Sequence, residues 1–123
     1  RVDEAIAMAV MYTANHLKVT AIIALTESGS TARWMSRIRS DIPIYALTPH
    51  AATRRRVTIY RGVIPVHFGA DHADGSPYRR VFDTLLSRKL ASVGDYVIVT
   101  KGDVEGVSGG TNAMTIVQVT EAS

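Results

Sequence analysis

Apolar segments of strand length alternate along this chain with segments of helical periodicity, and this alternation limits the folds open to it. Residues 21–25, Ala-Ile-Ile-Ala-Leu, form a continuous apolar run, which is typical of a parallel strand buried on both faces. A segment with helical hydrophobic spacing follows this apolar run, and another follows each of the next two apolar runs along the chain. Alternating strands and helices predict an α/β fold, in which helices cover both faces of a mostly parallel sheet.

These segments divide the chain into five expected strands and four expected helices. The strands are residues 21–25, 44–47, 63–67, 96–100 and 113–119, and the helices are residues 3–17, 31–40, 49–60 and 77–90. We expect Thr48 to cap the third helix, because Pro49 suits the first helical position. The first helix carries two apolar stripes, which indicates that it packs on two partners. One stripe comprises Val2, Ile6, Val10, Thr13 and Leu17, and the other comprises Ala5, Met8 and Tyr12.

Two features set the expected order of the strands. Pro65 lies inside the third strand and cannot donate a ladder hydrogen bond, which favours a sheet edge. Residues 101–112 contain four glycines and no helical period, so they do not suit the helical crossover that a parallel return needs. The fifth strand should therefore run antiparallel to the fourth. The sequence predicts a three-layer α/β/α fold with a mixed five-stranded sheet in the order 3-2-1-4-5.

A loop of small polar residues follows the first strand directly. Its members are Thr26, Glu27, Ser28, Gly29, Ser30 and Thr31. Hydroxyls, a glycine and backbone N–H groups at the start of a helix suit a phosphate group, because the amides donate hydrogen bonds and the helix dipole favours negative charge. The loop contains no lysine or arginine and does not match the nucleotide-binding pattern G-x-x-x-x-G-K-[ST]. The same residues also suit a helix cap that binds no ligand.

The expected strand order places this loop beside a second glycine-rich loop. The order reverses between the first and fourth strands, and ligands of open α/β sheets bind at such points, beyond the carboxyl ends of the strands. Residues 26–31 and 101–112 leave these two ends. We therefore predict that a small phosphorylated ligand binds between them.

The chain of 123 residues carries a net charge of +3, and its basic residues are clustered. The clusters are Arg33, Arg37 and Arg39, then Arg54, Arg55, Arg56 and Arg61, then Arg79, Arg80, Arg88 and Lys89. They alternate with apolar residues at helical spacing and lack interleaved aromatics, so we expect a partner-facing or ligand-steering surface and no nucleic acid. The length suits one domain. The absence of cysteine favours the reducing cytoplasm, and no apolar run reaches the ~20 residues of a membrane span.

Other polar groups of the chain match no catalytic or metal-binding pattern. His67, Asp71, His72 and Asp74 match no zinc or EF-hand spacing, so we expect a polar surface loop there and no bound metal ion. The serines of the first loop lack the G-x-S-x-G context of a hydrolase nucleophile, so no catalytic residue is expected. Because the chain begins at Arg1 without a methionine, we expect it to be excised from a longer protein.

Five short motifs occur in order along the whole chain. They are residues 5–7 (Ala-Ile-Ala), 25–32 (Leu-Thr-Glu-Ser-Gly-Ser-Thr-Ala), 43–48 (Pro-Ile-Tyr-Ala-Leu-Thr), 60–65 (Tyr-Arg-Gly-Val-Ile-Pro), and 101–103 (Lys-Gly-Asp) with 109–114 (Gly-Gly-Thr-Asn-Ala-Met). This ordered set resembles the C-terminal domain of pyruvate kinase, in particular the bacterial branch that sugar or nucleotide monophosphates activate.

The resemblance implies a parent enzyme that transfers phosphoryl from phosphoenolpyruvate to ADP in glycolysis, using Mg²⁺ and K⁺. That chemistry would take place in a TIM barrel that lies N-terminal to this chain. The chain itself would be catalytically silent, without a cofactor of its own. It would act as a regulatory domain that contacts the barrel and helps to build a homotetramer. An alternative is a free-standing phosphate-binding module of the same fold with no kinase attached.

The resemblance also implies where an effector would bind. Its phosphate would contact the loop spanning Thr26–Thr31, and a closing loop would comprise Gly106, Val107, Ser108, Gly109, Gly110 and Thr111. Relatives that respond to fructose 1,6-bisphosphate tend to carry a basic residue at the position of Glu27. This chain also has Asp103 and Glu105 in the second loop, so a sugar or nucleoside monophosphate is the expected effector. Arg79 and Arg80 are the cations that could reach it from the fourth helix.

Overall fold

Five strands form one central sheet in this computed structural model, which describes residues 2–38, 40–69, 77–102 and 111–121. The strands are β1 (Ala21–Leu25), β2 (Ile44–Thr48), β3 (Val63–His67), β4 (Tyr96–Gly102) and β5 (Thr111–Gln118). Their order is β3-β2-β1-β4-β5, with β5 antiparallel to β4 and the other neighbours parallel. The predicted order and directions are confirmed.

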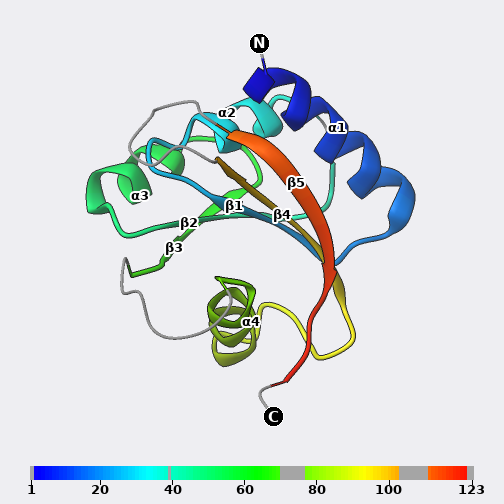
Figure 1. Cartoon of the computed structure of the whole chain (residues 1–123). Helices are drawn as coiled ribbons and strands as arrows, with labels where there is room; N and C mark the ends of the chain where they lie inside the picture. The colour runs from blue at the N-terminus through cyan, green and yellow to red at the C-terminus, as the bar shows by residue number, and fades with distance from the viewer. Residues whose placement is uncertain (1, 39, 70–76, 103–110, 122–123) are drawn as a thin grey trace.

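Helices cover both faces of this sheet. They are α1 (Val2–Leu17), α2 (Ser30–Ser36), α3 (Ala51–Val57) and α4 (Pro77–Ser87). In Figure 1, α1, α2 and α3 lie above the sheet and α4 lies below it. The three layers confirm the predicted α/β/α architecture.

The strands supply side chains to two separate cores, because successive residues of a strand point to opposite faces. In β1, Ile22 and Ala24 pack with the buried residues of α1, α2 and α3. Ala21 and Ile23 pack with the buried residues of α4. Both sets must be apolar, which explains why this strand reads as an uninterrupted hydrophobic run.

The face that α1 presents to the sheet differs from both predicted stripes. Its buried residues are Ala7, Val10, Met11 and Ala14, at the i, i+3, i+4 and i+7 spacing of one helix face. Among the members of the first predicted stripe whose side chains the structure describes, only Val10 is fully buried. Met8 and Tyr12 of the second stripe are 59% and 66% exposed. Alanine is only weakly apolar, so the hydrophobic pattern did not reveal the small residues that let α1 approach the sheet.

Three helices end earlier than predicted, and one of them, α3, ends at Val57 and not at Tyr60. α2 ends at Ser36 and not at Ser40, because the next two backbone N–H groups bond to carbonyls three residues before them, as in a tightened last turn. α4 ends at Ser87 and not at Leu90, and Lys89 adopts a positive φ of 59°. That left-handed conformation is typical of the residue after a helix end.

The start of α3 also differs from the prediction. Thr48 is the last residue of β2 and pairs with His67 of β3. The helix begins at Ala51, and its N-cap residue is His50. The Thr48 hydroxyl accepts a hydrogen bond from the His50 N–H at 3.2 Å. Thr48 therefore supports the turn before α3 without being its cap, and Pro49 lies outside the helix.

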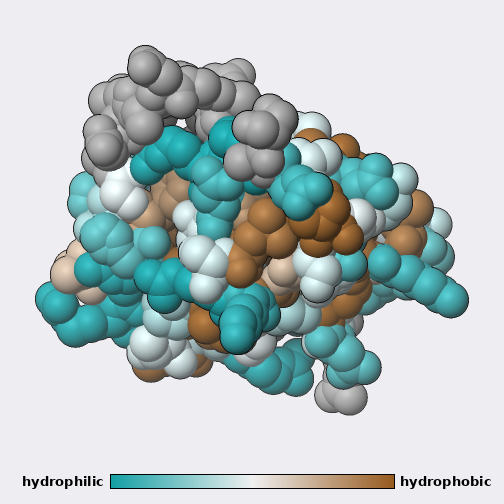
Figure 2. Space-filling view, turned by 90° about the horizontal axis from the view of Figure 1, so that it is seen from below, coloured by the Kyte–Doolittle hydropathy of each residue, from teal (hydrophilic) through white to brown (hydrophobic). Residues whose placement is uncertain are grey.

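The surface on the side of α4 is mostly polar. Val81, Phe82 and Leu85 of this helix are buried against the sheet. Figure 2, which views the molecule from below, shows hydrophilic residues over much of this side and a hydrophobic strip near its middle. Within the described ranges, no helix has both the length and the apolar character that a membrane crossing needs.

Candidate functional site

Residues Thr26–Thr31, here called the hydroxyl loop, leave the carboxyl end of β1 and lead into α2. The Thr26 N–H donates to the Leu47 carbonyl at 3.1 Å, so the loop begins as an extension of the β1–β2 ladder. On the other side of β1, the register pairs Ala24 with Thr100 of β4. The hydroxyl loop therefore lies where the strand order reverses, which is the position that its sequence predicted.

Gly29 brings the hydroxyl loop close to α3. It is the N-cap residue of α2 and has a φ of 87° and a ψ of 3°, a left-handed conformation that favours glycine. A Cβ atom at this position would lie 2.7 Å from Cγ1 of Val57, which is fully buried. Both the backbone conformation and the contact with α3 therefore require glycine here.

Two hydroxyls of the loop bond to the loop itself. The Thr26 hydroxyl accepts from the Gly29 N–H at 2.7 Å. The Ser28 hydroxyl accepts from the Ser30 N–H at 3.3 Å. These side chains hold the turn that leads into α2, whose N-cap residue, Gly29, provides no side-chain cap. Thr31, another predicted phosphate contact, is buried, with 2% of its surface exposed.

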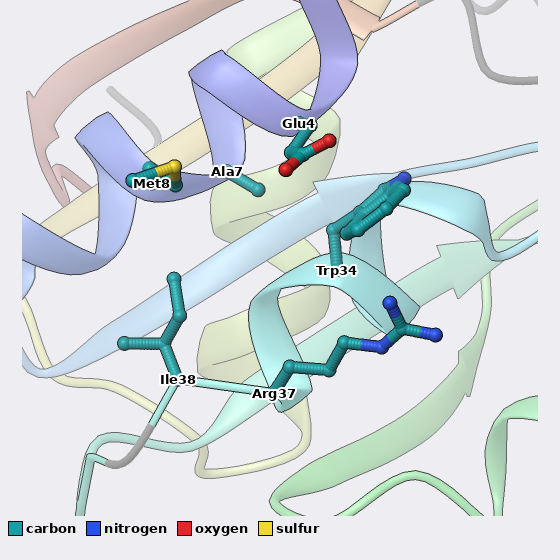
Figure 3. A pocket seen from close by; sticks show the side chains of 6 residues that line it. All are labelled: Glu4, Ala7, Met8, Trp34, Arg37 and Ile38. Carbon is teal, nitrogen blue, oxygen red and sulfur yellow. The ribbon is translucent and has the colours of Figure 1, made fainter. Parts of the chain in front are cut away.

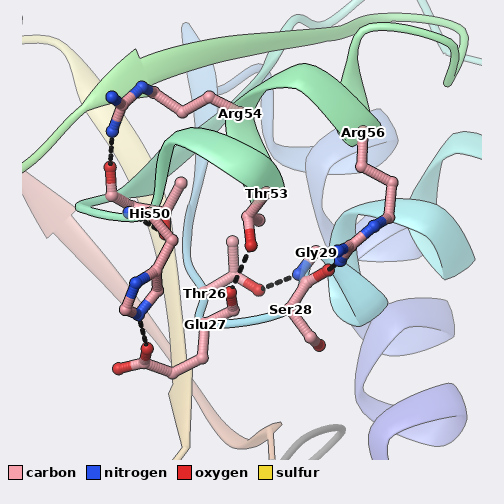
Figure 4. A network of polar contacts seen from close by, with 9 residues as sticks. Thr26, Glu27, Ser28, Gly29, His50, Thr53, Arg54 and Arg56 are labelled. Carbon is pink, nitrogen blue, oxygen red and sulfur yellow. Dashed lines mark hydrogen bonds and ion pairs between the residues drawn. The ribbon is translucent and has the colours of Figure 1, made fainter.

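Side chains from α3 reach the hydroxyl loop from one side, as Figure 4 shows. The Thr53 hydroxyl donates to the Glu27 carbonyl at 2.6 Å. The Arg56 guanidinium donates to the Ser28 carbonyl at 2.8 Å. The His50 ring forms a hydrogen bond with the Glu27 carboxylate, and both side chains are exposed. None of these three residues, two of α3 and its N-cap His50, was predicted to belong to the site.

The arginines of α3 were predicted to face a partner or steer a ligand, and two of them have a different role. Arg54 donates to the carbonyl of Thr48 at 2.9 Å, and Arg56 bonds to the hydroxyl loop. Arg55 is exposed and its side chain has no described hydrogen bond. The sequence identifies these arginines only as part of a basic helical segment. The carbonyl that accepts from Arg54 lies six residues earlier in the chain, and the carbonyl that accepts from Arg56 lies 28 residues earlier.

The predicted closing loop is only partly within the described structure. Residues 103–110, which include Gly106, Val107, Ser108, Gly109, Gly110 and the acidic pair Asp103 and Glu105, lie outside the described residues. Thr111 is the first residue of β5 and pairs with Gly102 of β4. The antiparallel ladder therefore begins before residue 113, where this strand was predicted to start, and the contact of Thr111 with an effector stays a prediction. Gly102 and Thr111 nevertheless mark the same edge of the sheet as the hydroxyl loop.

The two arginines of α4 have partners elsewhere. Arg79 pairs with Asp83 at 2.9 Å and donates to the Thr120 carbonyl at 2.7 Å. Arg80 donates to the Gly69 carbonyl. No described contact joins either guanidinium to the hydroxyl loop.

An apolar groove of about 260 Å³ lies between α1 and α2 (Figure 3). Its lining residues are Glu4, Ala7, Met8, Trp34, Arg37 and Ile38. The Arg37 guanidinium lies 4.7 Å from the centroid of the Trp34 ring, and Trp34 also packs against the core. The groove contains no residue of the hydroxyl loop, so the two features are separate.

The described residues contain no group of three or more His, Cys, Asp or Glu side chains that could hold a metal ion. His67 lies at the end of β3, and residues 71, 72 and 74 of the weighed cluster lie outside the described structure. The hydroxyl loop has hydroxyl and amide groups, together with the Glu27 carboxylate and the His50 ring that contacts it.

Comparisons with known proteins agree with this architecture. The family model for the pyruvate kinase alpha/beta domain matches residues 4–117. The chain is 52% identical over 120 residues to pyruvate kinase II of Salmonella typhimurium, covering 96% of the chain and 25% of that protein. It is 47% identical over 120 residues to pyruvate kinase of Buchnera aphidicola subsp. Schizaphis graminum, covering 97% of the chain and 25% of that protein. It thus spans about a quarter of the length of these curated relatives.

Proposed function

Because this chain belongs to the pyruvate kinase alpha/beta-domain family, we propose that it is the regulatory domain of a larger, cytoplasmic pyruvate kinase. The parent enzyme would transfer phosphoryl from phosphoenolpyruvate to ADP, giving pyruvate and ATP. Its barrel domain would hold Mg²⁺ and K⁺. The described part of this chain offers no cluster of metal ligands, and no step assigned to this chain involves those ions.

The regulatory role consists of binding a sugar or nucleoside monophosphate at the hydroxyl loop. The position of this loop beyond β1, where the strand order reverses, is the observation that carries the proposal. The hydroxyls and amides of the loop suit one phosphoryl group. The Glu27 carboxylate at the loop disfavours a second phosphate by like-charge repulsion. Residues 106–111 would close over the ligand.

Calorimetry with four ligands tests this function: ribose 5-phosphate, adenosine monophosphate, glucose 6-phosphate and fructose 1,6-bisphosphate. Hydrogen bonds to a charged phosphate contribute about 1.5–3 kcal/mol each. Ser28→Ala and Ser30→Ala should therefore weaken monophosphate binding roughly ten- to a hundredfold. Ser36→Ala is the matched control, because Ser36 lies in the last turn of the same helix and bonds to the Arg33 carbonyl.

Two outcomes would count against the proposal. If none of the four ligands binds and a crystal grown with phosphate shows no anion at the loop, the loop is only a helix cap. If Ser36→Ala weakens binding as much as Ser28→Ala, the ligand does not contact the loop directly. A gene that lacks a barrel upstream of this segment would favour the alternative, a free-standing phosphate-binding module.

We also propose that the exposed side of α1 contacts another subunit in a homotetramer. Met8 and Tyr12 are 59% and 66% exposed on this helix, and Met8 also lines the apolar groove beside α2. A large apolar side chain next to an apolar groove is typical of a protein contact surface. The expected partner is the same helix of a second copy.

Met8→Glu should shift the chain toward the monomer in sedimentation experiments. A charge buried at the contact without a partner would cost several kcal/mol. Ile59→Glu is the control, because this substitution introduces the same charge at a different surface position. Ile59 is 79% exposed and lies just beyond the end of α3. If the wild-type chain forms a dimer and Met8→Glu leaves it intact, this side of α1 is not the contact.

A further inference from the structure

One face of α3 contacts consecutive residues of the hydroxyl loop. His50, Thr53 and Arg56 follow one another at three-residue intervals, so they lie along the same side of the helix. Their partners are Glu27 and Ser28. Figure 4 shows the three side chains directed from α3 toward the loop. One short helix thus determines how two successive peptide groups of the loop are turned.

The bond from Thr53 orients the peptide group between Glu27 and Ser28. Its hydroxyl donates to the Glu27 carbonyl at 2.6 Å, so this carbonyl faces α3. The peptide is trans, and a trans peptide directs its C=O and N–H to opposite sides. The Ser28 N–H therefore points away from α3. No described residue accepts a hydrogen bond from this N–H.

The bond from Arg56 orients the next peptide group. Its guanidinium donates to the Ser28 carbonyl at 2.8 Å, so the Gly29 N–H points away from α3 as well. That N–H donates to the Thr26 hydroxyl at 2.7 Å. The loop therefore presents the Ser28 N–H on the side away from α3. Beside it lies the Thr26 hydroxyl, which already accepts the hydrogen bond that closes the turn.

The helix that makes these bonds is itself held in place. Arg54 donates to the carbonyl of Thr48 at the end of β2, at 2.9 Å. Thr53 and Val57 are buried, with 4% and 0% of their surfaces exposed. The side chains that contact the loop thus project from an element that packs on the core.

We infer that Thr53 and Arg56 are positioning residues, which hold the hydroxyl loop in the conformation that presents the Ser28 N–H to a phosphate oxygen. This inference rests on the proposed function, because it assigns the ligand to the hydroxyl loop. Neither residue contacts the ligand in this arrangement. Each acts through a backbone carbonyl, so the identity of the loop side chains does not affect its role.

Thr53→Val and Arg56→Ala in the full chain test the inference with two independent readouts. Thr53→Val removes one hydroxyl at nearly constant volume, and Arg56 is a surface residue, so both variants should fold; a thermal unfolding curve checks this. Amide hydrogen exchange, followed by NMR without ligand, should become about tenfold faster at Gly29. The affinity for ribose 5-phosphate should fall by about tenfold in each variant.

Arg55→Ala is the matched control for Arg56→Ala. It removes the same charge from the neighbouring, exposed position of α3, where the side chain has no described hydrogen bond. This variant should change neither the Gly29 exchange rate nor the affinity for ribose 5-phosphate. Equal effects of Arg55→Ala and Arg56→Ala would overturn the inference in favour of general electrostatic attraction.

The remaining outcomes separate this inference from the proposed function. Unchanged Gly29 exchange in Thr53→Val and Arg56→Ala overturns the positioning role, even if ribose 5-phosphate binds to the wild type. Faster exchange with unchanged affinity overturns the link between loop order and binding. If the wild type binds no ribose 5-phosphate, the proposed function fails, and the exchange rates still decide whether α3 holds the loop.

Discussion

Replacing Gly29 with valine is expected to destabilise the chain by about 2–5 kcal/mol and to abolish phosphate binding at the hydroxyl loop. A left-handed backbone conformation costs a residue with a Cβ about 1–2 kcal/mol. The new Cβ would also lie 2.7 Å from Cγ1 of Val57, and relieving such overpacking costs about 1–3 kcal/mol. Thermal or urea unfolding measures the first effect, and calorimetry with ribose 5-phosphate measures the second.

Gly94→Val is the control for backbone strain alone. Gly94 has a φ of 96°, but a Cβ there would meet no atom within 4 Å. Gly94→Val should therefore be destabilised only by the cost of placing a residue with a Cβ in the left-handed conformation. Equal destabilisation by Gly29→Val and Gly94→Val would show that the approach of α3 to the loop contributes nothing. Binding of ribose 5-phosphate by folded Gly29→Val with wild-type affinity would contradict the proposed site.

Glu27→Lys is expected to increase the affinity for fructose 1,6-bisphosphate roughly ten- to fiftyfold, because the charge beside the loop changes by two units. The affinity for ribose 5-phosphate should change less, since one phosphate is already held by the loop. The loop should keep its conformation, because Thr53 and Arg56 bond to backbone carbonyls and not to the Glu27 side chain. Calorimetry with both ligands measures the change in preference.

Glu121→Lys controls for the change in net charge. Glu121 is exposed near the end of the described chain, beyond β5, and its replacement alters the total charge by the same amount. Salt screens such distant charges strongly, so its effect at 0.15 M salt should be small. If wild-type protein already binds fructose 1,6-bisphosphate more tightly than any monophosphate, the interpretation of Glu27 is wrong.

The architecture could be predicted from the amino-acid sequence, because the relevant signals are local. The apolar run of β1 is continuous since its residues serve two cores, one on each face of the sheet. Pro65 correctly indicated an edge strand, and the glycine-rich segment after β4 correctly indicated an antiparallel return. The position of the hydroxyl loop at the reversal of strand order then followed from topology.

The residues that surround the hydroxyl loop and the helix faces that are buried could not be predicted in this way, because they depend on how the elements pack together. Thr53 bonds to a residue 26 positions earlier in the chain, and Arg56 to one 28 positions earlier. The local sequence of α3 does not identify these partners, because the contacts arise only when the helix packs on β2 and β3. The buried face of α1 and the start of β5 at Thr111 were missed for the same reason: burial and ladder length depend on what lies opposite, whereas hydrophobic periodicity describes only the segment itself.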